Sequence, residues 1–216
     1  MTEDEKAGKS AFIWDLDGTL LDSYAVIVPS LHEACLEYGI NIGQSEVLDE
    51  VISRTVGSFF NKIRNEYDVP MEDLINRYME IKDRRMPEIR SIKNASEILR
   101  YLKDRHIPNY VFTHRGSSTA AVLKNTGLYD FFDEIVTGKD GFPRKPDPSA
   151  VNYLIEKYNL DRDNTYYVGD RTLDVECAEN AGIRSILYLP EDSPAKPTGK
   201  ETHIVRDLME ISRLIC

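Results

Sequence analysis

Two aspartates one residue apart, Asp15 and Asp17, directly follow a short apolar run at residues 11–14. Such a run is typical of a buried β-strand. Side chains two positions apart in a strand point the same way, so Asp15 and Asp17 are expected to project together from its end, before Gly18 allows a tight turn. Taken alone, the pair also fits a solvated turn or a simple cation site. Two like charges this close need a cation or a proton to offset their repulsion. The pair therefore indicates a metal-assisted site in which one acid is the nucleophile and the other a general acid/base.

Three further segments place polar side chains at the expected ends of strands. Thr113 ends an apolar run, and its hydroxyl is suited either to a phosphate oxygen or to capping the next helix. Lys145 stands in a proline-rich segment, where a held ammonium suits phosphate, although such a segment alone is more typical of a surface loop. Asp170 ends another apolar run and is a suitable oxygen ligand for a hard cation. Asp174 is suited to join that ligand set, to pair with Lys145, or simply to begin a helix.

Short apolar runs alternate with helical patterns through most of the chain. The runs predict strands at residues 11–14, 109–112, 134–136, 165–168 and 185–189. Amphipathic spacing predicts helices between most of these runs. The alternation is typical of βαβ units, so the sequence predicts an α/β fold with a parallel sheet. In such sheets the polar residues at the carboxyl ends of the strands come together.

Residues 23–86 break this alternation. They contain no convincing strand and show several stripes of apolar residues at helical spacing, which predict a small helical bundle inserted after the first strand. We interpret the bundle as a lid over the acidic site, with a mere packing domain as the alternative. The expected division is a mobile tail at residues 1–10, a core at 11–22 and 87–216, and a helical cap at 23–86.

Composition narrows the classes of protein that the chain can belong to. Its 216 residues carry a net charge of −10 with no long basic cluster, which argues against a nucleic-acid partner. Its three cysteines lie far apart and read as reduced thiols of a cytoplasmic protein. No apolar stretch approaches the ~20 residues of a membrane span, and the first ten residues lack an apolar signal core. Composition leaves open whether the chain is a monomer or a dimer.

Together, the four polar segments resemble the motifs of the haloacid dehalogenase superfamily. The stretch DLDGTL at residues 15–20 resembles its first motif, Thr113 the second, Lys145 the third, and Asp170 with Asp174 the fourth. The order and spacing fit nearly the whole chain from residue 11. The helical insert is similar to the cap of the subgroup that holds phosphoglycolate phosphatases and β-phosphoglucomutases. The resemblance implies a Rossmann-like three-layer core with a parallel sheet and a small inserted cap.

The resemblance also implies a chemistry. The chain would be a phosphoric monoester hydrolase, a Mg²⁺-dependent phosphatase acting on a small phosphorylated metabolite. Asp15 would attack phosphorus and form an aspartyl-phosphate, and Asp17 would protonate the leaving oxygen and then activate water. Mg²⁺ would be held by Asp15, the Asp17 backbone carbonyl and Asp170. Thr113 and Lys145 would bind the transferring phosphoryl group.

The second and third motifs depart from the family pattern. His114 and Arg115 follow the motif threonine, where the family commonly has asparagine. We expect His114 to take part in phosphate binding, with a purely structural histidine as the alternative. Arg144 directly precedes the motif lysine and is suited to add affinity for an anion.

Substrate choice is expected to depend on the inserted segment. Arg54 and Gly57 fall in a stretch that resembles the family's cap substrate loop, and Arg54 is suited to a carboxylate or a second phosphate. Asp17 favours phosphoryl chemistry, because dehalogenases of the superfamily lack that acid. A β-phosphoglucomutase-like mutase is the alternative enzyme. A non-catalytic sensor of phosphorylated metabolites is less favoured, since Asp15, Asp17 and Lys145 are all present.

Overall fold

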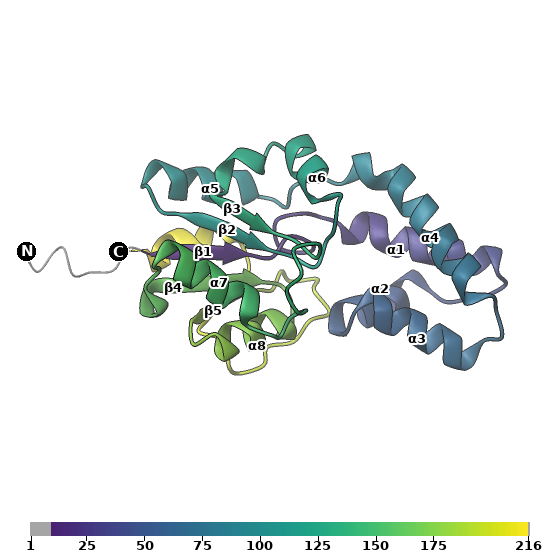
Figure 1. Ribbon diagram of the computed structural model, residues 1–216. Helices are drawn as coiled ribbons and strands as arrows, with labels where there is room; N and C mark the ends of the chain where they lie inside the picture. The colour runs from purple at the N-terminus through teal and green to yellow at the C-terminus, as the bar shows by residue number, and fades with distance from the viewer. Residues whose placement is uncertain (1–9, 216) are drawn as a thin grey trace, which may run out of the picture. The chain divides into compact units, whose positions relative to one another are not determined.

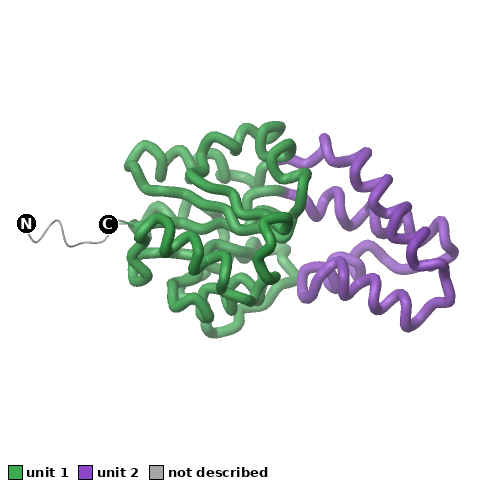
Figure 2. The backbone as a smooth tube through the Cα atoms, in the orientation of Figure 1, with its two compact units in different colours: residues 1–21, 91–216 green, residues 22–90 purple. Residues whose placement is uncertain are grey.

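The computed structural model describes residues 10–215, and the chain divides into two compact units. Unit 1 comprises residues 1–21 and 91–216, and unit 2 comprises residues 22–90 (Figure 2). Unit 2 is therefore an insertion between the first strand of unit 1 and the remainder of that unit. The tail expected at residues 1–10 lies, apart from Ser10, outside the described residues.

Unit 1 is built on a six-stranded parallel sheet in the order β3-β2-β1-β4-β5-β6. The strands are β1 Ala11–Trp14, β2 Asn109–Phe112, β3 Glu134–Val136, β4 Thr165–Gly169, β5 Arg184–Tyr188 and β6 His203–Val205. The five strands predicted from apolar runs are confirmed, and the ends of β4 and β5 differ by one residue. The edge strand β6 was not predicted, because it has three residues and Ile204 at its centre is exposed.

Helices cover the two faces of this sheet (Figure 1). The α-helices of unit 1 are α5 Ala95–Asp104, α6 Thr119–Asn125, α7 Ser149–Tyr158 and α8 Thr172–Asn180, and the 3₁₀ segments are η3 Tyr129–Phe131, η4 Arg162–Asn164 and η5 Leu208–Leu214. Ala11 and Ile13 of β1 pack in one apolar cluster with α7 and α8. Phe12 and Trp14 point to the other face, as the two-residue period of a strand requires. The predicted three-layer α/β fold is thus confirmed.

The order of the strands reverses beside β1. From β1 the chain builds outward through β2 and β3, then returns to place β4 on the other side of β1 and builds outward through β5 and β6. Ligands of open α/β sheets bind at the carboxyl ends of the strands where the order reverses. In this chain the residues that follow β1 and β4 there are Asp15 and Asp170.

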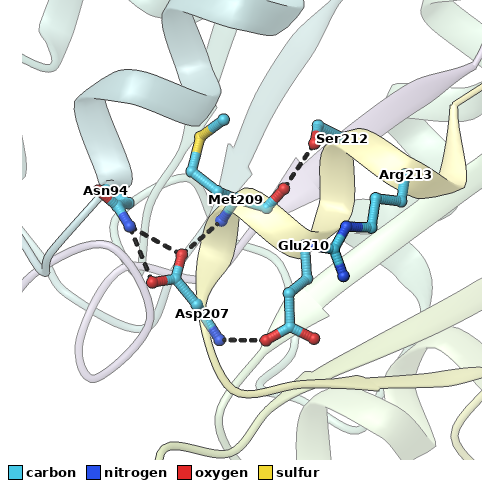
Figure 3. Close-up of a pocket in the computed structure, with 6 residues that line it drawn as sticks. All are labelled: Asn94, Asp207, Met209, Glu210, Ser212 and Arg213. Atoms are coloured by element: carbon cyan, nitrogen blue, oxygen red, sulfur yellow. Dashed lines mark hydrogen bonds between the residues drawn. The ribbon is translucent and has the colours of Figure 1, made fainter.

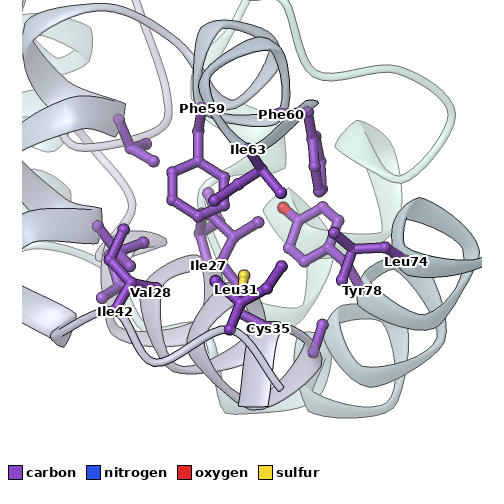
Figure 4. Packing of buried hydrophobic residues seen from close by; sticks show 14 of the residues in the cluster. Ile27, Val28, Leu31, Cys35, Ile42, Phe59, Phe60, Ile63, Leu74 and Tyr78 are labelled. Atoms are coloured by element: carbon purple, nitrogen blue, oxygen red, sulfur yellow. The ribbon is translucent and has the colours of Figure 1, made fainter. Parts of the chain in front are cut away.

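Unit 2 consists of helices joined by short loops, with no strand among its described residues. It contains α1 Tyr24–Glu37, α2 Gln44–Ser53, α3 Val56–Glu66, α4 Met71–Arg85 and the 3₁₀ turn η2 Met86–Glu88. A separate apolar cluster holds these helices together, with Leu31, Phe59 and Ile63 fully buried at its centre (Figure 4). The sequence stripes correspond to α1, α3 and α4. Within residues 10–215 no helix combines the length and the apolar composition that crossing a bilayer requires.

Candidate functional site

Four charged side chains are buried within residues 10–215, and all four are motif residues: Asp15, Lys145, Asp170 and Asp174. Among the other charged residues of the described chain, Arg115 also has a side chain that is only 8% exposed, although the residue as a whole is half-buried. Moving a charged group out of water costs several kcal/mol unless close partners offset the cost. A cluster of buried charges is therefore better explained by a function than by a gain in stability. This cluster in unit 1 is therefore the candidate site.

Lys145 binds two of the three carboxylates. Its Nζ lies 2.5 Å from Asp15 Oδ1 and 2.8 Å from Asp174 Oδ1, and its side chain has no exposed surface. The rings of Phe112 and Tyr167 lie with their centroids 5.3 and 5.1 Å from the ammonium. Burial lowers the pKa of Lys145, but the two carboxylates outweigh it and the net shift is upward. Lys145 therefore stays protonated and is held as a fixed point charge.

Asp174 reaches this position because Gly169, the last residue of β4, has no side chain. A Cβ at Gly169 would lie 2.3 Å from the Cβ and Cγ of Asp174, a separation that packed atoms do not adopt. The second oxygen of Asp174 accepts a hydrogen bond from the Arg171 amide at 3.1 Å, at the start of α8. Of the alternatives for Asp174, the structure shows both the ion pair with Lys145 and the helix start.

Asp15 has one engaged and one unengaged oxygen. Oδ1 accepts the Lys145 ammonium, whereas Oδ2 is buried and has no hydrogen-bond partner among the described residues. Burial raises the pKa of Asp15 to about 6, against the lowering effect of Lys145 and with a further increase from Asp174. At neutral pH the group is therefore still mostly ionised, with a carboxylate oxygen available for a bond to metal or substrate.

Asp15, Asp170 and Asp174 form the one group of three or more His, Cys, Asp or Glu among the described residues whose side chains lie close enough together to share a metal ion. One oxygen from each lies within 4.8 Å of the others. Thr19 orients Asp170 by donating its hydroxyl to Oδ1 at 3.2 Å. With all three acids ionised, three buried carboxylates face a single buried ammonium, an excess of two negative charges. Oxygen ligands and this excess are suited to a hard divalent cation.

Asp17 has a different partner from Asp15. Its Oδ1 accepts two hydrogen bonds from the Arg115 guanidinium, one from Nε at 3.1 Å and one from Nη2. β1 ends at Trp14, and the chain turns at Gly18 with a φ of 89°, as the glycine predicted. Arg115 departs from the family pattern, but its pairing with Asp17 across 98 positions has no signal in the sequence.

Thr113 is buried directly after β2, beside the strand that carries Asp15. Its Oγ1 accepts a hydrogen bond from the Arg115 amide at 3.1 Å, so its own hydroxyl proton remains to be donated. The next helix, α6, begins at Thr119 with Ser118 as its N-cap, which excludes the helix-capping alternative for Thr113. Arg144 is exposed.

His114 is directed toward the backbone of the lysine segment. Its Nε2 accepts a hydrogen bond from the Lys145 amide at 2.7 Å. Burial and the nearby Lys145 charge lower the pKa of His114 to about 3, so the ring is neutral. Nε2 is thus used as an acceptor and cannot donate a hydrogen bond to an anion.

Arg54 and Gly57 belong to unit 2 and lie where α2 meets α3. Arg54 ends α2 and forms an exposed ion pair with Glu50 at 3.4 Å. Thr55 caps α3 by accepting the Ser58 amide at 2.9 Å, which places Gly57 in the first turn of that helix. The guanidinium of Arg54, on a side chain that is 67% exposed, remains accessible to a ligand.

A pocket of about 450 Å³ in unit 1 lies apart from these residues (Figure 3). It is lined by Asn94, Asp207, Met209, Glu210, Ser212 and Arg213. Its acids are engaged within the fold, because Asp207 accepts both Asn94 and the Met209 amide, and Glu210 accepts the Asp207 amide. None of the predicted site residues lines it.

Comparisons with known proteins agree with the motifs. The family model described as haloacid dehalogenase-like hydrolase matches residues 12–188. The chain is 24% identical to the pyrophosphatase PpaX of Oceanobacillus iheyensis over 94% of its own length and 95% of the relative's. It is 29% identical to a phosphoglycolate phosphatase of Vibrio cholerae over 80% of each chain.

A solved structure supports the same fold. A haloacid dehalogenase-like protein of unknown function from Agrobacterium tumefaciens superposes with a TM-score of 0.82 at 20% identity, covering 96% of this chain and 97% of that one. At this level of identity the likeness concerns the fold. With the family model spanning most of the chain and the motif residues buried together, this protein belongs to the haloacid dehalogenase-like hydrolase family.

Proposed function

We propose that this hydrolase is a Mg²⁺-dependent phosphatase that acts on a small phosphorylated metabolite through an aspartyl-phosphate. One observation carries the proposal: the charged residues that are buried as a whole in the described chain are the four motif residues, gathered at the reversal point of the sheet, with one oxygen of Asp15 unengaged. Relatives named pyrophosphatase and phosphoglycolate phosphatase, which match 94% and 80% of this chain, support the reaction class.

In the first step, Asp15 is the nucleophile. A carboxylate with a pKa of about 6 is ionised at neutral pH and needs no base to activate it. As its oxygen bonds to phosphorus, the bond from phosphorus to the leaving oxygen breaks and Asp17 gives that oxygen a proton. Lys145 and the Thr113 hydroxyl stabilise the charge on the transferring group, where fixed positive and dipolar groups have their largest effect.

In the second step, water attacks phosphorus and Asp17 takes its proton. The bond from Asp15 to phosphorus then breaks, which regenerates both carboxyl groups. Arg115 holds the Asp17 side chain in one orientation between these events. Asp17 is half-buried rather than fully enclosed, so solvent can supply the water.

The residues suited to hold Mg²⁺ are Asp15 and Asp170, with the Asp17 backbone carbonyl as the third protein ligand and Asp174 orienting the set. When bound, the ion offsets the repulsion between an anionic nucleophile and an anionic phosphate. Mg²⁺ keeps several of its waters, so few protein ligands are sufficient. In this function unit 2 serves as a cap, and Arg54 and Gly57 of that unit select the substrate.

Phosphate release tests this proposal directly. We would incubate the wild type, Asp15→Asn and the exposed control Asp130→Asn with a panel that includes pyrophosphate, phosphoglycolate and sugar phosphates, with and without Mg²⁺. The expected result is release that needs both Mg²⁺ and Asp15 and is unchanged in Asp130→Asn. An isomerised sugar phosphate without net release would identify a mutase instead. Release that persists in Asp15→Asn would refute the aspartyl-phosphate route.

A further inference from the structure

We propose that His114 is a positioning residue for Lys145, which it holds by accepting the hydrogen bond of the Lys145 backbone amide. This assigns His114 a place behind the phosphoryl site rather than in contact with the phosphate. The inference rests on the proposed function in one respect, that Lys145 binds the transferring phosphoryl group.

The hydrogen bond settles the protonation of the ring. A nitrogen that accepts an N–H at 2.7 Å has no proton of its own, so the proton of the neutral imidazole is on Nδ1. Nδ1 is buried and has no hydrogen-bond partner among residues 10–215. The Nδ1–H group is thus left without an acceptor, while Nε2 keeps the lone pair that accepts the Lys145 amide. This indicates that the bond to the Lys145 amide is the hydrogen bond for which the tautomer is kept.

The backbone around His114 is itself closely packed. A Cβ at Gly138, in the loop after β3, would lie 2.6 Å from the carbonyl oxygen of His114. The Gly138 amide also donates to the Arg115 carbonyl at 2.9 Å. The Phe112 ring meets the imidazole edge-on with centroids 6.0 Å apart. The histidine ring is therefore a rigid acceptor rather than a flexible side chain.

The lysine segment needs such a support on this side. Its other side is tied to α8, where Asn180 donates to the Pro146 carbonyl at 2.9 Å and the Cys177 thiol donates to the Asp147 carbonyl at 3.4 Å. His114 supplies the tie on the side of β2. The ammonium of Lys145 lies between two carboxylates with no exposed surface, so a displacement of its backbone moves the charge away from the nucleophile.

Two substitutions at His114 separate positioning from other roles. His114→Gln places an amide oxygen near the position of Nε2 and keeps an acceptor for the Lys145 amide. His114→Phe keeps the ring and its packing against Phe112 but has no acceptor. Unfolding followed by the fluorescence of Trp14, the single tryptophan of the chain, in β1, verifies that each variant is folded.

Three measurements are then compared: hydrogen exchange of the Lys145 amide, calorimetric binding of inorganic phosphate with Mg²⁺, and kcat/KM on the best substrate. In His114→Phe we expect exchange to accelerate by about 100-fold or more, and phosphate affinity and kcat/KM to fall by about 10-fold or more, because misplaced catalytic groups cost rate steeply. In His114→Gln all three should stay within about 3-fold of the wild type.

Each contrary outcome has its own meaning. Unchanged exchange of the Lys145 amide in His114→Phe overturns the hydrogen bond as the support. Faster exchange with undiminished phosphate affinity overturns the functional role. Equal losses in His114→Gln and His114→Phe overturn positioning in favour of a contact that only imidazole can make. If the wild type releases no phosphate from any substrate of the panel, the proposed phosphatase function is refuted. Hydrogen exchange of the Lys145 amide and phosphate affinity then still decide the role of His114.

Discussion

Replacement of Gly169 by alanine tests whether the close approach of β4 to Asp174 holds the site together. The added methyl group would lie 2.3 Å from the Cβ and Cγ of Asp174. Gly169 is not in the left-handed region, so alanine meets no conformational obstacle there and only the collision opposes it. The Asp174 side chain is at the N-terminal turn of α8 and cannot move without losing its present bonds.

The expected cost follows from those bonds. A displaced Asp174 loses the ion pair with Lys145 at 2.8 Å and the cap on the Arg171 amide at 3.1 Å. Removing one partner of a buried ion pair costs about 3–5 kcal/mol of stability, and loss of a helix N-cap costs about 1 kcal/mol. Partial relaxation reduces the sum, so we expect Gly169→Ala to lower the unfolding free energy by about 2–4 kcal/mol. For a chain of this size, that corresponds to a Tm lower by roughly 5–15 °C.

Denaturant unfolding followed by Trp14 fluorescence measures this cost, because Trp14 directly precedes Asp15 in the buried β1 strand. Gly116→Ala is the matched control, since a Cβ there meets the flexible Lys139 side chain at 3.4 Å and no backbone. We expect the control to stay within about 1 kcal/mol of the wild type. A Gly169→Ala protein as stable as the control, with the same response to Mg²⁺, would refute the reasoning.

Three further perturbations test other parts of the molecule. Burial raises the pKa of Asp15 from 3.8 to about 6. In metal-free protein its ionisation therefore lowers stability by about 2–3 kcal/mol as pH rises from 4 through 6, with no further loss above. Asp15→Asn should abolish that fall in denaturant unfolding with chelator present, and parallel wild-type and variant profiles would contradict the sign. Mg²⁺ at about 100 times its Kd should stabilise the wild type by about 2.7 kcal/mol in thermal unfolding. Asp170→Asn should lose most of that gain, and an equal gain in both proteins would exclude Asp170 as a ligand. Phe59→Ala, in the fully buried centre of unit 2, should cost about 3–5 kcal/mol and speed hydrogen exchange in α1 and α3. Unchanged exchange in α1 would show that the aromatic cluster does not hold the unit.

The central strands and the motif residues were predictable because their signals are local. β1, β2 and β4 are buried on both faces, so each is a mainly apolar run, and the polar residue that follows each run marks the carboxyl edge of the sheet. Asp15, Thr113 and Asp170 follow those strands directly. The parallel alternation of strands and helices then requires these ends to meet at one edge, whatever the detailed packing.

The edge strand β6 had no such signal. Of its three residues only Val205 is buried, and pairing with β5 depends on the rest of the sheet being in place. The helix α2 was also less evident than its neighbours, since the buried Val47, Val51 and Ile52 occupy only one narrow stripe among polar residues. Such elements bury few apolar residues, so their sequences show only a weak apolar pattern.

The amino-acid sequence by itself determined which residues could do chemistry, since acid, hydroxyl and ammonium groups are properties of residue type and strand ends are a local pattern. Only the tertiary structure decided which groups are partners: Lys145 with Asp15 across 130 positions, Arg115 with Asp17 across 98, and the His114 ring with the Lys145 amide. The reason is physical. Burial, which raises the pKa of Asp15 and lowers that of His114, and collisions of the kind that only a glycine at position 169 avoids, depend on atoms that distant segments bring together.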